Sequence, residues 1–361
     1  MKRKILIASP AQFGYSSTGY PYFCRRLKGN FEIDFLCIDK GWLRVSEPGI
    51  NIIYVRSTKS KIKTILNLTR LAIRLSYQEN YAVLFCLYYR VAFFVGLLAR
   101  SNLKILDIRT GSIIDNGFCR KMDNTLMLLT SLSFDKTAVV SRSLADILKL
   151  PSKKTTVLPQ GSEVIDRSTK KYDRMHLIYV GTLHKRHIEK TIEGFAIFYK
   201  KYSGKISIRY DILGFSNRKA DSNKIFSAIE KHNLEETVLY HGRKTHQEMQ
   251  QYFKESTIGV CFVPRTSFYN VQPSTKIFEY ALSGLITIAT ETYENCLLIN
   301  DTNGVICQDN PEGFCAGLEK IYSNLPKYNE LQIRNSLANF HWDNIINTTL
   351  LPLLVDARTR F

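Results

Sequence analysis

The stretch QPSTKIFEYALSGLITIAT (residues 272–290) combines a helix start, an apolar helix and a buried strand. Pro273 and Ser274 favour a helix N-terminus, because Pro suits the first helical position and Ser caps helices. After Gly284, the apolar run LITIAT (285–290) is too short for a helix and predicts a strand. A helix that leads into a buried strand is typical of parallel sheets with crossover helices.

The same alternation continues along the whole chain. Short apolar runs predict strands over residues 4–9, 32–38, 50–55, 82–87, 104–109, 136–141 and 155–160, and then over 176–181, 207–214, 237–242, 256–263, 285–290 and 304–308. Amphipathic segments predict helices over 19–28, 59–78, 90–100, 117–132 and 142–149, and then over 187–202, 219–233, 245–254, 274–283, 293–299 and 311–323. The predicted fold class is α/β, with two Rossmann-like open parallel sheets that face a cleft.

The polar segment EVIDRSTKKYDRMH (163–176) interrupts this pattern with seven charged residues and no apolar periodicity. Such a segment is expected of a linker between domains. We predict one Rossmann-like domain over residues 1–165 and a second over 166–338. In the C-terminal segment, 339–361, we predict a helix that packs back on the first domain.

Positive charge is concentrated in the first half of the 361 residues. Residues 1–165 carry 25 Lys and Arg against 11 Asp and Glu, a balance of +14, while residues 166–361 carry 25 against 21, a balance of +4. The excess indicates a polyanionic partner, either nucleic acid or an anionic membrane surface. No nucleic-acid-binding module is recognisable, and aromatic residues fall mainly in predicted strands and helices, so we favour the membrane surface.

The segment KSKIKTILNLTRLAIRLS (59–76) is the candidate for that membrane contact. Lys63, Asn67, Arg70 and Arg74 recur at intervals of four, three and four, which places a polar stripe along a helix that is apolar elsewhere. Such a helix suits an anionic lipid surface. The alternative is an ordinary crossover helix with one solvated face.

Three features predict a cytoplasmic protein, and the basic excess with the segment 59–76 adds the expectation that it is peripheral on the inner face of the membrane. The eight cysteines include no Cys-x-x-Cys pair and fall mostly in apolar stretches, as reduced core residues do. The start of the chain has only four consecutive apolar residues before Ser9, too few for a secretory signal. The longest apolar run, 91–99, covers nine residues, whereas a membrane span needs about 20.

A candidate anion site lies in YVGTLHKRHIEKTIEGF (179–195). A predicted strand ends at Gly181, which lets a ligand approach the backbone, and the basic residues 184–187 follow at a helix start. A helix N-terminus with cations beside it suits a diphosphate. The alternative is a solvated basic turn.

The stretch 272–290 predicts a similar site. Lys276 lies in the first turn of its helix, where the helix dipole disfavours a cation unless an anion is bound. Glu279, three residues further on, projects to a similar side, and its carboxylate can accept hydrogen bonds from two ribose hydroxyls. The alternative is a surface Lys–Glu pair.

In this order and spacing, YVGTLHKRHIEKTIEGF, YDILGF, VLYHGR, IGVCFVP and QPSTKIFEYALSGLITIAT resemble the nucleotide-binding domain of family 4 retaining glycosyltransferases of the GT-B fold. In the first half, ILIASPAQFGYSSTGYPYF resembles their first strand and glycine-bearing loop, and AVVSRSLADIL with TTVLPQGSE resembles the segments before the hinge. The resemblance is to the bacterial cell-surface polysaccharide type. It implies transfer of a sugar, with retention of configuration, from a UDP- or GDP-type donor in the second domain to a lipid-linked glycan acceptor in the first.

The resemblance also implies roles for single residues. Arg186, or its neighbour Lys185, matches the basic residue that holds the donor diphosphate, and Lys276 would be a second phosphate contact or a brace for the loop. Glu279 matches the carboxylate that binds the donor ribose. Gly214 and the loop after it would lie near the nucleobase.

Two further parts of the donor site follow from the resemblance. The backbone of Gln272, Pro273, Ser274 and Thr275 would face the sugar and the α-phosphate. Gly14, in the first loop, would close on the donor from the first domain.

The chain departs from the family in two places. Val271 stands where many members have a second Glu, eight residues before the ribose-binding one, and no His precedes His176, so the first-domain His of several relatives is absent. Asp107 and Arg109, at the end of a predicted strand facing the cleft, are the remaining first-domain candidates for a catalytic role. The alternative for them is a loop-stabilising ion pair.

Charge explains how such a site would work. Cleavage of the sugar–phosphate bond builds negative charge on the departing diphosphate, so Arg and Lys side chains placed beside it lower the barrier. We expect no metal or other cofactor, because the sequence has no evident Asp-x-Asp pair or clustered His and Cys ligands. Two alternatives remain open: a GT-B epimerase or phosphorylase, and a basic nucleic-acid-binding protein.

Overall fold

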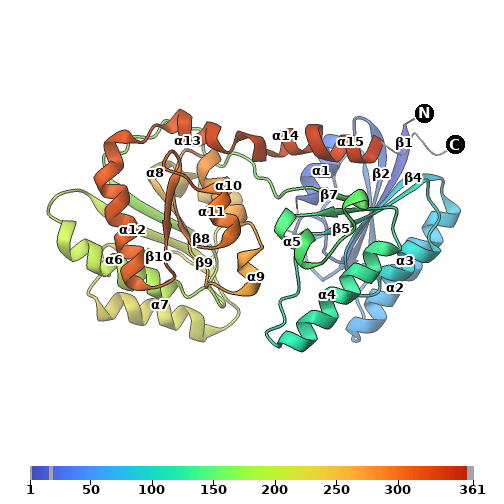
Figure 1. The fold of residues 1–361 in the computed structure, drawn as a ribbon, viewed down its shortest axis with the longest axis horizontal. Helices are drawn as coiled ribbons and strands as arrows, with labels where there is room; N and C mark the ends of the chain where they lie inside the picture. The colour runs from blue at the N-terminus through green and yellow to red at the C-terminus, as the bar shows by residue number, and fades with distance from the viewer. Residues whose placement is uncertain (1, 16–18, 356–361) are drawn as a thin grey trace. The chain divides into compact units, whose positions relative to one another are not determined.

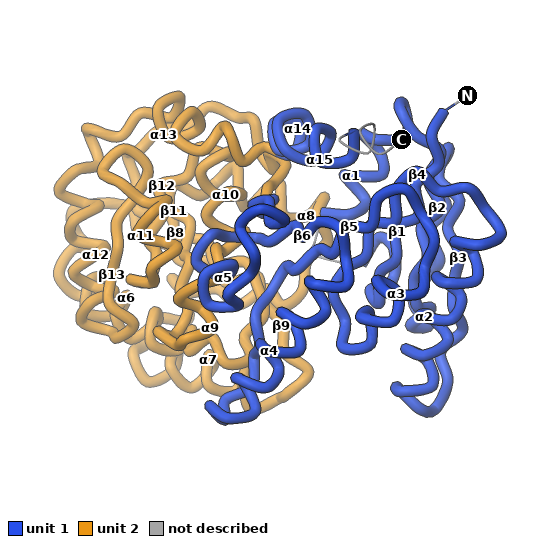
Figure 2. The backbone as a smooth tube through the Cα atoms, turned by 45° about the vertical axis from the view of Figure 1, so that its right-hand side comes forward, with its two compact units in different colours: residues 1–160, 342–361 blue, residues 161–341 orange. Residues whose placement is uncertain are grey.

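The computed structural model describes residues 2–15 and 19–355. The chain divides into two compact units: unit 1 is residues 1–160 with 342–361, and unit 2 is residues 161–341 (Figure 1, Figure 2). The chain passes from one unit to the other between residues 160 and 161 and again between residues 341 and 342. The sequence predicted these boundaries at 165/166 and 338/339. Ile165 is buried in the core of unit 2 and Trp342 in that of unit 1, so apolar packing sets these positions.

Unit 1 is built on a parallel sheet with the strand order β3-β2-β1-β4-β5-β6-β7. Its strands are β1 (Arg3–Ser9), β2 (Phe31–Asp39), β3 (Ile50–Arg56), β4 (Tyr81–Leu87), β5 (Leu103–Ile108), β6 (Lys136–Val139) and β7 (Thr155–Val157). They alternate with α1 (Tyr20–Leu27), α2 (Lys61–Gln78), α3 (Ala92–Leu98), α4 (Gly117–Leu132) and α5 (Arg142–Ile147). Ile5 of β1 lies between Ile33 of β2 and Val83 of β4, and such two-sided burial explains the continuous apolar runs.

The C-terminal segment completes unit 1 with α14 (Trp342–Ile345), a π-helical turn (Ile346–Leu350) and α15 (Leu351–Val355), while residues 356–361 lie outside the described part. Trp342 packs edge-on against Phe23 of α1, with ring centroids 5.3 Å apart. Gly19, just before α1, has φ +78°, and a Cβ there would lie 2.5 Å from the Trp342 ring. Both the backbone conformation and the tryptophan therefore require glycine at this position.

Unit 2 has the strand order β10-β9-β8-β11-β12-β13, again with parallel pairing. The strands are β8 (Met175–Thr182), β9 (Ile208–Phe215), β10 (Val238–Tyr240), β11 (Ile258–Cys261), β12 (Ile286–Thr290) and β13 (Gly304–Cys307). The helices are α6 (Ile188–Tyr202), α7 (Lys219–Lys231), α8 (His246–Glu255), α9 (Ser267–Asn270), α10 (Thr275–Leu282), α11 (Tyr293–Leu298), α12 (Pro311–Asn324) and α13 (Glu330–Ser336). The order changes direction between β8 and β11, and open α/β sheets bind ligands beyond the strand ends at such a switch point.

The predicted alternation of strands and helices is confirmed, with differences at some ends. The strand predicted over 155–160 ends at Val157, since Pro159 has no N–H for the sheet. The short helices α9 and α13 have no predicted counterpart, because four and seven residues hold too little periodicity to recognise.

The segment 163–176 is not the exposed linker that its charges predict. It belongs to unit 2, where Lys170 is only 7% exposed, pairs with Asp166 at 2.6 Å and donates to the carbonyl of Phe253. Arg334 of α13 donates to the carbonyl oxygens of Asp166 and Ser168. Contacts with distant residues bury Lys170 and hold this segment on unit 2, and a local sequence pattern cannot show such partners.

Candidate functional site

The candidate site lies at the carboxyl ends of β8 and β11, where the strand order of unit 2 changes direction. β8 leads into the loop 183–187 and then α6, while β11 leads through α9 into α10. Parallel neighbouring strands end at the same edge of a sheet, so segments far apart in the sequence meet there.

The loop between β8 and α6 has an unusual backbone. Lys185 and His187 have φ values of +56° and +54°, a left-handed conformation that costs a non-glycine residue about 1–2 kcal/mol. Between them, the Arg186 N–H donates to the Leu183 carbonyl at 3.1 Å and closes a turn. Strain of this kind persists only where surrounding contacts fix it, and it is common at binding sites.

The side chain of Arg186 packs against an aromatic ring. Its guanidinium carbon lies 4.6 Å from the ring centroid of Tyr269 in α9, which is a cation–π contact. Arg186 is partly buried, while Lys185 is exposed. Of the two candidates for holding a diphosphate, the geometry favours Arg186, because a guanidinium already fixed in place loses less entropy when it binds.

Cys261, the last residue of β11, lies where several candidate residues meet. Burial raises the pKa of its thiol to about 11, although a hydrogen bond with Ser274 and the positive charges of Arg186 and Lys276 oppose the rise. The negative charge of the Glu279 carboxylate, like burial, raises the pKa of the Cys261 thiol. The structure thus brings four predicted residues within electrostatic reach of one point, and we call them the switch-point cluster: Arg186, Ser274, Lys276 and Glu279.

The start of α10 supplies backbone donors to this cluster. Ser274 occupies the N-cap position, but its side chain makes no capping hydrogen bond within the described part of the chain. Lys276 Nζ lies 2.5 Å from Glu279 Oε2, and the two side chains are 25% and 20% exposed. The Lys–Glu pair is therefore formed, yet it stays open to solvent on one side, where an anion could approach.

Glycine allows the loop after β8 to lie close to β9. Gly181 and Gly214 are paired in the two strands, and a Cβ on Gly214 would lie 2.8 Å from Leu183 Cδ2 and 3.0 Å from the Gly181 oxygen. Just beyond, the guanidinium carbon of Arg243 lies 4.9 Å from the ring centroid of Phe215. The stacked side chains of Arg243 and Phe215 thus lie beside the loop after Gly214, which the sequence analysis predicted to lie near the nucleobase.

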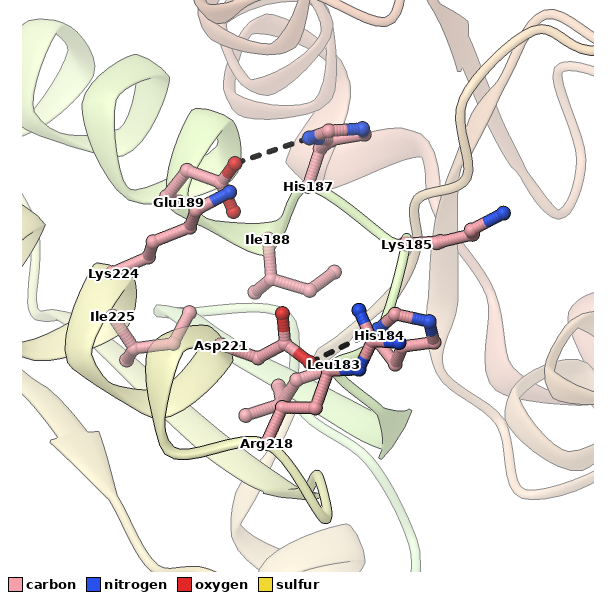
Figure 3. Close-up of a pocket in the computed structure, with 10 residues that line it drawn as sticks. All are labelled: Leu183, His184, Lys185, His187, Ile188, Glu189, Arg218, Asp221, Lys224 and Ile225. Carbon is pink, nitrogen blue, oxygen red and sulfur yellow. Dashed lines mark hydrogen bonds and ion pairs between the residues drawn. The ribbon is translucent and has the colours of Figure 1, made fainter.

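A pocket of about 230 Å³ lies beside the loop 183–187, between the starts of α6 and α7 (Figure 3). Its lining residues are Leu183, His184, Lys185, His187, Ile188, Glu189, Arg218, Asp221, Lys224 and Ile225. His184 Nδ1 lies 3.1 Å from Asp221 Oδ2, and His187 pairs with Glu189 at the same distance (Figure 3). Hydrogen bonds from Ser216, first, and from His184 hold the pKa of Asp221 below its usual value. The pocket therefore holds an ionised carboxylate among basic groups, next to the switch-point cluster.

Asp107 and Arg109 form a buried network in unit 1. Asp107 is fully buried, pairs with Arg109 at 2.7 Å and accepts a hydrogen bond of 2.5 Å from the Tyr20 hydroxyl. Burial and the Asp107 charge raise the pKa of Tyr20 well above its usual value, so the hydroxyl stays protonated. Arg109 also donates to the Leu158 carbonyl at 3.0 Å. Both side chains are buried within unit 1 and form the ion pair that the alternative reading expected, and their catalytic role stays a prediction.

The remaining residues predicted for the donor site lie in two places. Gln272, Pro273 and Thr275 lie at the entry to α10. Gly14 follows β1 with φ +85°, and a Cβ there would meet Val45 Cγ2 at 2.9 Å. Its part in donor binding stays a prediction.

The basic residues expected at a membrane, Lys63, Arg70 and Arg74, are exposed on α2. Their exposure is compatible with both alternatives for this helix, a lipid-facing stripe and a solvated face. The membrane role stays a prediction.

The sequence analysis missed Tyr269 and Cys261 as parts of the site. Tyr269 lies in a four-residue helix, which is too short to show a periodic pattern. It matters to the candidate site only because its ring contacts Arg186, which is far away in the sequence. In the sequence, Cys261 has the pattern of a buried strand residue, and it is buried in the structure. No local signal distinguishes either residue.

Known protein families and solved structures resemble this chain in sequence or in fold. Residues 174–324 match the family model for glycosyl transferases group 1, and this range contains the whole switch-point cluster. Sucrose-phosphate synthase from Thermosynechococcus elongatus superposes with a TM-score of 0.76 at 14% identity, over 99% of this chain and 100% of that one. The fold is GT-B. A glycosyltransferase from Rickettsia africae shares this GT-B fold with a TM-score of 0.75 at 16% identity, over the full length of both chains.

HepE from Anabaena, solved in complex with UDP, has a TM-score of 0.75 at 10% identity, over 99% of this chain and 100% of that one. No curated protein sequence gives a significant match. At these identities the structural likeness establishes the GT-B fold, while the family match concerns unit 2.

Proposed function

We propose that this chain is a glycosyltransferase that moves a sugar from a nucleoside-diphosphate sugar to a glycan acceptor. The proposal depends on the switch-point cluster, in which two cations, an uncapped helix start and a carboxylate meet at one sheet edge. The group 1 match over residues 174–324 supports it. Solved complexes of HepE with UDP and with UDP-glucose support a UDP-type donor, with GDP as the alternative.

In this proposal the diphosphate binds between Arg186 and the start of α10. As the sugar–phosphate bond breaks, negative charge grows on the diphosphate, and the guanidinium of Arg186 and the ammonium of Lys276 stabilise it. The positive end of the α10 helix dipole adds to this effect, because it favours an anion at the helix start. Lys276 then shares its charge between the phosphate and Glu279.

Glu279 binds the ribose of the donor. Its Oε2 accepts from Lys276, which leaves Oε1 without a partner within the described residues and able to accept from a ribose hydroxyl. Gly214 and the neighbouring stack of Arg243 on Phe215 lie on the side of the base. The backbone of 272–275 faces the sugar.

We also propose that catalysis needs no metal ion. Within the described residues, no group of three or more His, Cys, Asp or Glu is placed to hold one. In this proposal the cations of the switch-point cluster supply the positive charge.

The finer parts of the proposal come from the resemblance to family 4. They are retention of configuration, a lipid-linked acceptor bound by unit 1, and a role in surface polysaccharide synthesis at the cytoplasmic face of the membrane. The exposed basic residues of α2 support the membrane contact, since each Lys or Arg near an anionic surface contributes about 1 kcal/mol.

A thermal-shift screen with UDP, GDP and ADP tests the donor site. A nucleotide that binds only the folded state adds about 2.7 kcal/mol of stability at 100 times its dissociation constant. We expect UDP to give the largest shift. If none of the three nucleotides stabilises the protein, the donor-site assignment fails.

Product analysis separates the transferase from the GT-B alternatives. A transferase releases nucleoside diphosphate only when a glycan acceptor is present, whereas an epimerase releases none in net. A phosphorylase would consume inorganic phosphate instead of a nucleotide sugar.

A further inference from the structure

Exposed apolar side chains gather on three neighbouring helices of unit 1. Of the 22 large apolar side chains exposed within the described residues, ten lie on α2, α3 and α4. α2 contacts α3 and α3 contacts α4, and the helices lie side by side in both views (Figure 1, Figure 2). Exposed apolar side chains that lie on neighbouring elements often mark interaction sites.

The helix α4 turns its more apolar side to the solvent. Phe118, Met122, Leu129 and Leu132 are exposed by 72%, 59%, 49% and 49%, at intervals of four, seven and three that place them along one side of the helix. The buried positions of α4 are Met127, Thr130 and Ser131, of which two are polar. An ordinary crossover helix has the opposite arrangement, with its apolar side buried against the sheet.

The neighbouring helices extend this surface. On α3, Phe94, Leu97 and Leu98 are exposed by about half, and on α2 Ile62 is 75% exposed. We call the exposed apolar residues of α2, α3 and α4, with the basic residues between them, the α2–α4 surface.

The charge of the α2–α4 surface is strongly positive. The three helices carry six basic residues, Lys61, Lys63, Arg70, Arg74, Arg120 and Lys121, and one acidic residue, Asp123. Asp123 pairs with Arg90 at 3.4 Å, so it offsets little of this excess. Basic and exposed apolar side chains together are the composition of helices that lie in the interface of an anionic bilayer.

We propose that α3 and α4 insert their exposed apolar side chains into an anionic bilayer while the basic residues of α2 contact the lipid headgroups. The inference rests on the membrane contact of the proposed function. It differs in mechanism, because apolar side chains of α3 and α4 enter the bilayer, whereas the proposed function has only electrostatic attraction through α2. No helix in the described part of the chain is both long and apolar enough to span a bilayer. Lying in the interface requires no such length.

Flotation with vesicles of phosphatidylglycerol and phosphatidylcholine tests the proposal, with phosphatidylcholine alone as the uncharged reference. The double variant Phe118→Ser/Met122→Ser should bind anionic vesicles at least about tenfold more weakly than the wild type. The matched control is Leu297→Ser/Leu331→Ser, at residues 65% and 67% exposed in unit 2, and it should bind like the wild type. Lys63→Ala/Arg70→Ala/Arg74→Ala should weaken binding roughly a hundredfold, about fivefold for each charge.

Insertion has a spectroscopic signature as well. A Phe118→Trp variant should gain fluorescence quenching by brominated lipid over the wild type, because the indole would lie among the acyl chains. Equal quenching in the variant and the wild type would overturn insertion even if the charged residues bind vesicles.

Other outcomes also decide against the proposal. Wild-type binding by Phe118→Ser/Met122→Ser, or no binding of the wild type to anionic vesicles, overturns it. If the wild type is a dimer that this variant converts to a monomer, without vesicle binding, the surface joins two copies instead. Stabilisation by UDP should be unchanged in every variant, so failure of the membrane surface and failure of the donor site are measured separately.

Discussion

The two units each hold one charged pair that the sequence put forward for the site, and burial makes the two pairs different. In unit 1 the side chains of Asp107 and Arg109 are 0% and 4% exposed, whereas in unit 2 those of Glu279 and Lys276 are 20% and 25% exposed. Removing one partner of a buried pair leaves a charge without compensation, at a cost of about 3–5 kcal/mol. A pair that keeps contact with solvent contributes about 1 kcal/mol or less, so a ligand can replace one of its partners. We therefore expect similar chemistry to serve stability in unit 1 and, in the proposed function, binding in unit 2.

The largest effect is expected when the buried pair is broken. Arg109→Met should lower the free energy of unfolding by about 3–5 kcal/mol, because Asp107 stays buried without its cation. Urea denaturation monitored by circular dichroism measures this loss. The control Arg44→Met, which breaks an exposed pair with Asp39 in the same unit, should leave stability nearly unchanged. A similar stability for both variants would contradict the structural role of Asp107 and Arg109.

The second effect concerns the ligand rather than the fold. Arg186→Ala and Glu279→Ala should each abolish the stabilisation of about 2.7 kcal/mol that UDP provides at 100 times its dissociation constant for the wild type. Thermal shift with and without UDP measures it, and Lys200→Ala, at an exposed residue of α6, is the control. Unchanged shifts in both variants would remove the switch-point cluster from the donor site.

A smaller effect should follow when the third member of the buried network is changed. Tyr20→Phe removes the hydrogen bond of 2.5 Å to Asp107 and should cost about 2 kcal/mol, since a buried carboxylate oxygen loses its donor. Tyr77→Phe, at a tyrosine that is 64% exposed, is the matched control. Equal unfolding free energies for these two variants would mean that the carboxylate does not depend on Tyr20.

The smallest effect is expected at the partly exposed Lys276–Glu279 pair when no ligand is bound. Lys276→Met should change the free energy of unfolding by less than about 1 kcal/mol, because solvent compensates Glu279. The same variant should bind UDP more weakly, which isothermal titration measures. If Lys276→Met costs as much stability as Arg109→Met, the contrast between the two pairs is lost.

Much of the fold could be predicted because its signals are local. The helix α4 begins and ends at the predicted residues, and the strands of both sheets lie where short apolar runs stand between amphipathic segments. The exceptions are local as well: β7 stops before Pro159, and α9 is too short to show a period. For the site, Arg186, Ser274, Lys276 and Glu279 are residues that the sequence proposed and the structure brings together.

The sequence by itself determined the alternation of strands and helices and the chemical types available at each strand end, because both are properties of neighbouring residues. Only the tertiary structure decided that Tyr269 fixes Arg186, that Lys170 is buried and that Asp107 is closed to solvent. It also decided that α4 turns an apolar side outward. The reason is physical: burial and pairing depend on which distant segments meet, and the free energy of a charge changes by several kcal/mol with that environment.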